Sequence, residues 1–293
     1  MVDYKNVVAL VAGCTGGLGG TTTATLLSLG AKVIGVDIET IAERKVRTRE
    51  NNDAARTVDE VLKGEFPGKI DLFVEKAERA GRFVMHRGDI TSSEVLQSCF
   101  GSIDTSRGER LALAVNCAGY SERMMVYRES RDRMMDDEHL SLVFQDKVTC
   151  AFNFIRLCAQ QMSRGAVDSH DGKERGVIIN TSGIQGFDGQ EYMAAASAAD
   201  GAINSMTLPM SRDLAHCNIR VNTISPGHFK TNLVWENTRK MDPTVEKFLG
   251  SLNAFPFRLG KPHEFAQCVL DVYENGMMNG EVVRLDAGCR LPP

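Results

Sequence analysis

Three glycines near the N-terminus, Gly13, Gly17 and Gly19, stand at a spacing that is typical of phosphate binding. They follow an apolar run that is predicted to be a strand, and a helix is predicted to begin directly after them. Glycine lets the backbone turn tightly there and approach a pyrophosphate, which then lies against the first N–H groups of the helix. Thr15 and Leu18 belong to the same loop and are predicted to contact the same ligand.

Asp37 ends a second apolar run, residues 31–37 (AKVIGVD). A carboxylate at the end of that strand accepts hydrogen bonds from both hydroxyls of an adenosine ribose and repels a 2′-phosphate. The whole unit of strand, glycine loop, helix, strand and aspartate therefore predicts a dinucleotide site that prefers NAD to NADP. The alternative is that the glycines only allow the helix to pack closely on the sheet.

Seven short apolar runs alternate with helical stretches along the chain. Strands as continuously apolar as these belong to a parallel sheet that helices cover on both faces. We therefore predict an α/β fold, a single doubly wound Rossmann-type domain over residues 1–293 with a parallel sheet of about seven strands. The runs are residues 7–13, 31–37, 82–89, 111–119, 176–183, 219–227 and 280–288.

Two charged insertions interrupt this alternation, near residues 43–80 and 120–139. The first is longer than one crossover helix needs and is prone to form helix. The second, YSERMMVYRESRDRMMDDEH, is rich in methionine and shows no clear strand. Both are candidate surfaces for a protein partner, and the simpler alternative is a solvated helix face.

Composition argues against several kinds of partner. The net charge is −4, so the chain lacks the excess of positive charge that is typical of nucleic-acid binding. The eight cysteines include no CxxC pair and no His/Cys spacing of a metal site, which predicts no bound metal and a reducing, intracellular compartment. No apolar run is long enough to span a membrane.

Longer motifs follow one another in a recognisable order: GDIT at 88–91, NCAG at 116–119, GVIINTS at 176–182, TLPMSRDLA at 207–215, IRVNTISPG at 219–227, FPFRLGKP at 255–262 and GEVVRLD at 280–286. Together with the glycine loop, they resemble the short-chain dehydrogenase/reductase family nearly from end to end, the insertion near 43–80 excepted. The resemblance implies that further residues line the adenine, the pyrophosphate and the nicotinamide in turn. These are Asp89 and Ile90, then Asn116, Ala118 and Gly119, then Pro226, Gly227 and Thr231.

Hydride transfer in this family needs four side chains. A tyrosine is the general acid/base, a lysine lowers its pKa and holds the nicotinamide ribose, a serine binds the substrate oxygen, and an asparagine anchors a water of the proton relay. Aligned on the flanking motifs, this chain carries Ala196, Asp200, Gly183 and Lys147 at those four places in turn. Alanine cannot titrate, and Asp200 would raise the pKa of a nearby phenol. We therefore predict no catalytic residue at the family positions.

Three neighbours are weak substitutes. Ser182 is adjacent to the serine place, but successive residues of a strand point to opposite faces. Tyr192 lies four residues before Ala196, one helical turn away, and has no lysine four residues after it. His228 follows the SPG turn and could serve as a base. Packing explains Tyr192 more simply, and a satisfied polar contact explains His228.

These changes favour a catalytically inactive homologue that serves as a structural or regulatory, NAD(H)-binding subunit of a larger assembly. NAD(H) would bind weakly or not at all, because the tyrosine and lysine side chains that hold the nicotinamide ribose in the family are missing. The alternative is an NAD-dependent oxidoreductase of the 3-hydroxyacyl-CoA dehydrogenase type with relocated catalytic residues. The resemblance points to the mitochondrial matrix, with the cytoplasm as the other location.

The resemblance also implies a homo-oligomer, a tetramer or a dimer. Helices at about residues 136–164 and 191–215 would form a bundle across a two-fold axis, where the small residues of AAASAADGA allow close approach. The C-terminal residues 280–293 would form a second interface. In a mixed assembly these surfaces would bind another protein instead.

Lys147 and Asp200 are predicted to form an ion pair. The resemblance implies that these two places face each other across one water, so the two changes put a cation opposite an anion. Either change alone would bury an uncompensated charge, which costs about 3–5 kcal/mol. The alternative is that both side chains turn outward to water.

Overall fold

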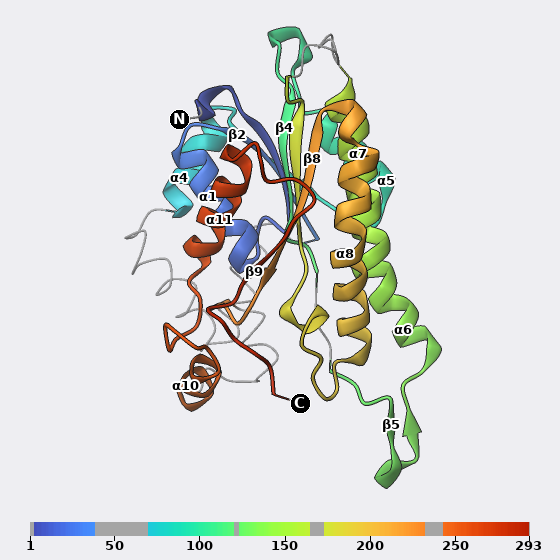
Figure 1. The fold of residues 1–293 in the computed structure, drawn as a ribbon. Helices are drawn as coiled ribbons and strands as arrows, with labels where there is room; N and C mark the ends of the chain where they lie inside the picture. The colour runs from blue at the N-terminus through green and yellow to red at the C-terminus, as the bar shows by residue number, and fades with distance from the viewer. Residues whose placement is uncertain (1–2, 39–69, 120–122, 165–172, 232–242, 293) are drawn as a thin grey trace.

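The computed structural model describes residues 3–38, 70–119, 123–164, 173–231 and 243–292. Seven strands form one parallel sheet in the order β3-β2-β1-β4-β7-β8-β9 (Figure 1). The predicted doubly wound, Rossmann-like α/β fold is thus confirmed. The strands are β1 (Val8–Ala12), β2 (Lys32–Asp37), β3 (Phe83–Arg87), β4 (Leu111–Asn116), β7 (Gly176–Thr181), β8 (Ile219–Pro226) and β9 (Val282–Leu285).

Helices cover both faces of the sheet, as Figure 1 shows. One face carries α1 (Gly17–Ser28), α4 (Ile70–Arg79) and α11 (Pro262–Glu274), and the other carries α5 (Ser93–Phe100), α6 (Asp137–Phe144), α7 (Cys150–Ser163) and α8 (Ala194–Asp213). A further helix, α10 (Pro243–Ser251), precedes the C-terminal part of the chain. Short 3₁₀ turns lie at Tyr4–Asn6, Thr105–Arg107, Glu129–Arg131, Ile184–Gly186 and Ala215–Cys217.

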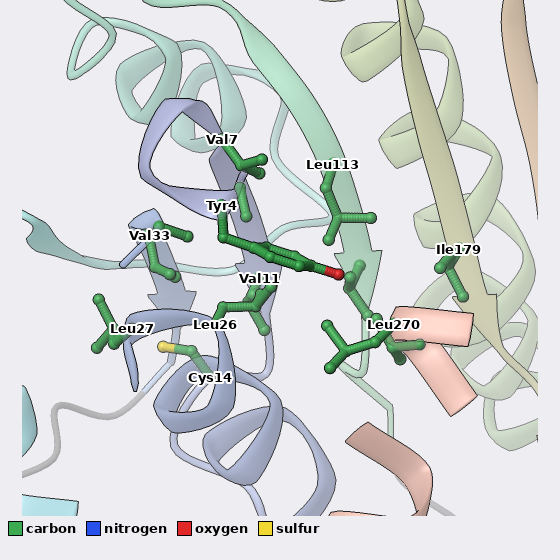
Figure 2. Packing of buried hydrophobic residues seen from close by; sticks show 14 of the residues in the cluster. Tyr4, Val7, Val11, Cys14, Leu26, Leu27, Val33, Leu113, Ile179 and Leu270 are labelled. Atoms are coloured by element: carbon green, nitrogen blue, oxygen red, sulfur yellow. The ribbon is translucent and has the colours of Figure 1, made fainter. Parts of the chain in front are cut away.

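The central strands are apolar on both sides because each face is buried. All five residues of β1 are buried. Ala9 and Val11 belong to the cluster under α1 and α11, whereas Leu10 belongs to the cluster under α5 and α7. This alternation follows from the two-residue period of a strand. Figure 2 shows Val11 among Leu26 of α1 and Leu270 of α11.

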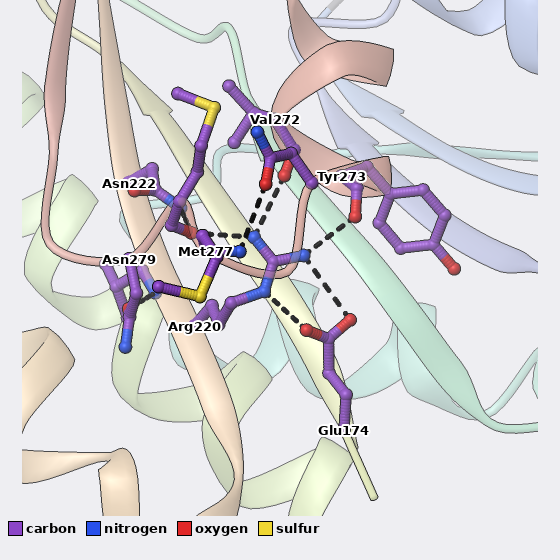
Figure 3. Close-up of polar contacts among 10 residues, drawn as sticks. Glu174, Arg220, Asn222, Val272, Tyr273, Met277 and Asn279 are labelled. Carbon is purple, nitrogen blue, oxygen red and sulfur yellow. Dashed lines mark hydrogen bonds and ion pairs between the residues drawn. The ribbon is translucent and has the colours of Figure 1, made fainter.

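Arg220 ties the end of α11 to β8, as Figure 3 shows. Its buried guanidinium donates hydrogen bonds to the carbonyl oxygens of Val272 (2.9 Å), Tyr273 (2.7 Å) and Met278 (2.7 Å), and it pairs with Glu174. The last carbonyls of a helix lack partners within the helix, and a guanidinium has five N–H donors to offer them. This network fixes β8, whose carboxyl end leads into residues 226–231 of the predicted site.

The insertion near residues 120–139 contains a small hairpin, so the expectation of no clear strand there was wrong. β5 (Tyr127–Arg128) pairs antiparallel with β6 (Arg133–Met134), and Asp132 closes the turn with a left-handed φ of 43°. Strands of two residues are too short to show an alternating pattern in the sequence. The hairpin stands away from the sheet, beyond the end of α6 (Figure 1). Of the other insertion, α4 is the described part, and residues 39–69 lie outside the described residues.

The helix predicted near residues 136–164 is real but not uniform. α6 and α7 are joined by a π-helical segment, Gln145–Thr149, which holds Lys147. π-segments are rare, occur often at functional sites and change which side chains face a neighbouring helix. In the described ranges, no helix is long and apolar enough to cross a membrane.

Candidate functional site

The glycine loop packs directly on the end of β4. Gly13 has a left-handed φ of 72°, and a Cβ on it would lie 2.7 Å from the carbonyl oxygen of Cys117. A Cβ on Gly19 would collide with the carbonyl oxygen of Gly13. Both glycines are therefore required by backbone packing, as the alternative interpretation held. Three of the first four residues of α1 are glycines, so backbone N–H groups at the start of the helix are open to a pyrophosphate.

Asp37 lies at the end of β2 and holds the glycine loop. Its Oδ2 accepts hydrogen bonds from the backbone N–H of Thr15 (3.0 Å) and from the Thr15 hydroxyl (2.7 Å), while Oδ1 accepts from the N–H of Ile38 (2.8 Å). A carboxylate oxygen has more than one lone pair, so these bonds leave capacity for a ribose hydroxyl. Asp37 thus has a structural role in addition to the predicted one.

The other predicted nucleotide residues line the carboxyl ends of the strands. Open α/β sheets bind ligands there, where the strand order reverses, which in this sheet is between β1 and β4. Asn116 accepts the N–H of Ala118 at 3.1 Å and so shapes the turn after β4. The remaining positions lie around it: Asp89 and the buried Ile90 follow β3, Gly119 faces open space, Pro226 and Gly227 end β8, and Thr231 lies against Gly17.

These residues fit a dinucleotide. Gly119 has no atom within 4 Å of the place that a Cβ would take, so the space beside β4 is clear. Across the loop, the Thr231 methyl group lies 2.6 Å from the place of a Cβ on Gly17, so only glycine is tolerated there. The nucleotide half of the site keeps the bare backbone and the acid that NAD binding requires.

The predicted ion pair between Lys147 and Asp200 is confirmed. Lys147 reaches from the π-segment to α8, where its Nζ lies 2.5 Å from Oδ1 of Asp200. The Lys147 side chain is 12% exposed and that of Asp200 is 2% exposed, so the pair is almost closed to water. The short N–O distance makes this a close ion pair between two buried side chains.

Burial dominates the chemistry of Asp200. Loss of water raises the pKa of its carboxyl group, and the Lys147 ammonium opposes that shift without cancelling it. The family's lysine place therefore holds an acid, and the cation beside it comes from the facing helix. Such a pair cannot lower the pKa of a phenol as a free lysine does.

Gly183 makes room for this pair. A Cβ at position 183 would lie 2.7 Å from Oδ2 of Asp200 and would collide with the side-chain amide oxygen of Gln185. The serine that the family carries there cannot coexist with Asp200 unless one of them moves. The changes at positions 147, 183 and 200 are therefore one structural unit. Sequence reasoning missed Gln185, and only its distance of two residues from Gly183 could have signalled it.

The position of the family tyrosine is filled by a buried methyl group. Ala196 lies on α8, one turn before Asp200, and is 2% exposed. No proton donor is present at this point of the helix. The adjacent Ser182 does not compensate, because its hydroxyl donates to the side-chain oxygen of Asn204 at 2.7 Å.

Tyr192 does not lie on the helix, which corrects the expected distance of one helical turn from Ala196. α8 begins at Ala194, and Tyr192 precedes it in a turn with a left-handed φ of 69°. That conformation is costly for a bulky side chain. The backbone is held there because the Tyr192 carbonyl oxygen accepts the N–H of Met124 at 2.8 Å. Arg123 lies over the ring, 6.0 Å from its centre.

His228 is half-buried directly after β8. Burial lowers the pKa of its imidazole, and the positive charge of Arg123 lowers it further, so the ring is neutral at neutral pH. Its Nδ1 is buried and has no partner in the described part of the chain. Sequence reasoning had singled out His228 as a weak candidate, but it had missed Arg123, which lies in a charged insertion where one arginine among several carries no signal.

Comparison with known proteins agrees with this geometry. The short chain dehydrogenase family model matches residues 61–242. The chain is 34% identical to the 3-hydroxyacyl-CoA dehydrogenase type-2 of Rattus norvegicus over 291 residues, which cover 99% of this chain and 98% of the rat protein. The protein of that name from Drosophila melanogaster is 34% identical over 289 residues, 99% of both chains.

A solved structure is also similar along its whole length. The crystal structure of 3-hydroxyacyl-CoA dehydrogenase type-2 from Mycobacterium avium matches with a TM-score of 0.78 and 25% identity, and the match covers 100% of this chain and 99% of that one. The sheet order, the glycine loop and the full-length similarity all point the same way. The chain belongs to the short-chain dehydrogenase/reductase family.

Proposed function

We propose that this protein is a catalytically inactive short-chain dehydrogenase/reductase that serves as a structural or regulatory, NAD(H)-binding subunit of a larger assembly. The observation that carries the proposal is the buried Lys147–Asp200 pair, which takes the place of the family's proton-transfer apparatus. Ala196 lies one turn before Asp200, so the place of the family's phenol holds a methyl group that cannot give or take the substrate proton. General acid–base catalysis contributes about 10²–10⁴-fold to such a reaction.

One observation favours an active enzyme as the second candidate. His228 offers a neutral imidazole at the end of β8, and its Nδ1 has no partner among the described residues. The relatives of this chain are also named as dehydrogenases. The experiment that separates the two is an NAD-linked assay with a 3-hydroxyacyl-CoA, run on the purified protein beside His228→Gln and Tyr192→Phe. An inactive subunit shows no turnover above the blank. Turnover that either substitution abolishes would establish the active alternative.

We expect NAD(H) to bind weakly and NADP(H) more weakly still. The bare glycine loop and Asp37 remain, but the tyrosine and lysine that grip the nicotinamide ribose are gone. Each lost hydrogen bond to a charged group costs about 1.5–3 kcal/mol, so affinity should be about tenfold or more below that of an intact family site. Calorimetric titration measures both dissociation constants. Asp37→Ala should reduce the preference for NAD, and tight NADP binding by the parent chain would contradict the expectation.

We infer that the protein assembles with copies of itself or with other proteins through α7 and α8. Large apolar side chains stay exposed along these helices: Phe144 precedes α7, Phe152 lies on α7 at 53% exposure, and Leu208 lies on α8 at 44%. Mass measurement in solution should find a dimer or a tetramer, and Phe152→Ser should shift it toward the monomer. A parent chain that is monomeric both alone and in extracts of its native cell would defeat this idea.

The mitochondrial matrix is our proposed location, with the cytoplasm as the alternative. Fractionation of the native cell, followed by affinity purification from the fraction that holds the protein, tests both the location and the assembly. Recovery of defined partner proteins at fixed ratio supports the subunit role. Recovery of the homo-oligomer alone would exclude the role of a subunit in a mixed assembly. The regulatory, NAD(H)-binding role would then remain.

A further inference from the structure

The two carboxylate oxygens of Asp37 differ in how much hydrogen-bonding capacity they have left. Oδ2 accepts two bonds from Thr15, one from the backbone N–H at 3.0 Å and one from the hydroxyl at 2.7 Å. Oδ1 accepts one bond, from the N–H of Ile38 at 2.8 Å. A carboxylate offers about four lone pairs, two on each oxygen. Oδ2 is therefore filled, and one lone pair of Oδ1 remains.

The backbone around this carboxylate is fixed on both sides. The Val36 carbonyl oxygen accepts the N–H of Gly13 at 2.9 Å, and the Asp37 carbonyl oxygen accepts the N–H of Gly88 at 2.9 Å. The end of β2 is thus held between the glycine loop and the end of β3. Asp37 cannot release Oδ2 by a shift of its backbone, so the release requires the hydroxyl of Thr15 to turn away.

We propose that Thr15 limits how this chain binds the adenosine ribose of a dinucleotide. The 2′ and 3′ hydroxyls of a ribose are neighbours, and a carboxylate with both oxygens open can accept a bond from each of them. In this chain the Thr15 hydroxyl fills Oδ2, so Asp37 binds a single ribose hydroxyl, through Oδ1. This inference rests on the proposed NAD(H)-binding function and gives a second reason for weak binding, beside the missing tyrosine and lysine.

Displacement of the Thr15 hydroxyl by the ribose would lead to the same result. Both bonds join a hydroxyl donor to the same charged oxygen, so the exchange replaces one charge-assisted hydrogen bond by another of the same kind. The second ribose hydroxyl then adds little affinity. A new bond to an open carboxylate oxygen, in contrast, belongs to the class of hydrogen bonds that contributes most.

Thr15→Val tests this directly, because it removes the hydroxyl and keeps the volume and the backbone N–H of residue 15. ADP is the probe, since it carries the adenosine ribose and the pyrophosphate but no nicotinamide ribose. Calorimetric titration should find that Thr15→Val binds ADP about tenfold more tightly than the parent chain, because a hydrogen bond to a charged group is gained. Thr15→Ser keeps the hydroxyl and should bind ADP as the parent does.

Two deoxy forms of the probe count the ribose hydroxyls that Asp37 binds. The parent should bind one of 2′-deoxy-ADP and 3′-deoxy-ADP about tenfold more weakly than ADP, and the other almost as tightly as ADP. Thr15→Val should bind both deoxy forms more weakly than ADP. The measurement on the parent needs no substitution, so it tests the inference even if Thr15→Val fails to fold.

Two further variants serve as controls. Thr25→Val removes a hydroxyl of α1 that donates to the Thr21 carbonyl oxygen at 2.8 Å, and it should leave the affinity for ADP unchanged. In an Asp37→Ala background, Thr15→Val should no longer tighten binding, because the effect of the hydroxyl passes through the carboxylate that it contacts.

Three results would overturn the inference while leaving NAD(H) binding in place. They are equal affinity of the parent for the two deoxy forms, ADP binding by Thr15→Val that is no tighter than that of the parent, and a tightening that persists without Asp37. If neither the parent nor Thr15→Val binds ADP or NAD, the inference and the NAD(H)-binding role fail together.

Discussion

Replacing Lys147 with methionine should lower the free energy of unfolding by about 3–5 kcal/mol at neutral pH. Methionine keeps the length of the apolar stem but removes the only cation found within 4.0 Å of Asp200 in the described residues. The Asp200 side chain is 2% exposed, so water cannot take the place of the lost partner. Chemical denaturation of the parent and the variant at pH 7 measures the difference.

The pH dependence of this loss distinguishes an unpaired charge from a packing defect. Burial raises the pKa of Asp200 in the folded chain, and without Lys147 that pKa rises further. A group with a raised folded pKa contributes stability at low pH that is lost as the pH rises through the folded value. The penalty of Lys147→Met should therefore be full at neutral pH and should shrink as the pH falls toward about 3.9, the ordinary pKa of an aspartate.

Matched variants separate the ion pair from the loss of a lysine as such. Lys230 pairs with Glu246 at 3.0 Å, but both side chains are about one-third exposed, so Lys230→Met should cost less than about 1 kcal/mol. The double variant Lys147→Met with Asp200→Leu removes both charges and should recover most of the stability. Asp200→Lys alone should be destabilising, because it places two cations at one point. A loss below about 1 kcal/mol in Lys147→Met, or a loss that does not change with pH, would show that the pair is solvated.

The pair could be predicted from the sequence because both changes fall at positions of known mutual placement. The strands could also be predicted, because short, continuous apolar runs such as β1 alternate along this chain with helical stretches. That alternation indicates buried strands of a parallel sheet. The hairpin at β5 and β6 was missed because two-residue strands leave no pattern. The left-handed backbone of Tyr192 was also missed, since tyrosine rarely adopts it and nothing local requires it. A tertiary contact, the hydrogen bond from the Met124 N–H to the Tyr192 carbonyl oxygen, accompanies the second of these features.

Restoring the four family side chains together should create dehydrogenase activity, about 10²–10⁴-fold above the background rate that the parent chain shows. The variant combines Lys147→Asn, Gly183→Ser, Ala196→Tyr and Asp200→Lys. Positions 196 and 200 share one face of α8, so a tyrosine and a lysine there can meet as the proton transfer requires. The assay is NAD-linked oxidation of a 3-hydroxyacyl-CoA, because the relatives carry that name.

The order in which the changes are made should matter. Gly183→Ser alone forces a side chain against Oδ2 of Asp200, 2.7 Å from the new Cβ, and overpacking of this kind costs about 1–3 kcal/mol. In the background of Lys147→Asn with Asp200→Lys, that carboxylate is gone and the Gln185 side-chain amide oxygen is the remaining close contact, so the same substitution should cost less. Non-additivity of this size is expected only for groups in direct contact.

A single atom provides the control for the restored activity. The same four-residue variant with Ala196→Phe in place of Ala196→Tyr fills the same volume on α8 but lacks the hydroxyl, so it should fold equally well and stay inactive. Equal activity of the two variants would show that the proton leaves through another group, and His228 would then be the first to replace. If neither variant is active although both are folded and bind NAD, the substrate end of the crevice has changed as well. That result would shift attention from the four substituted positions to Arg123 and the hairpin, which lie outside the proton-transfer apparatus.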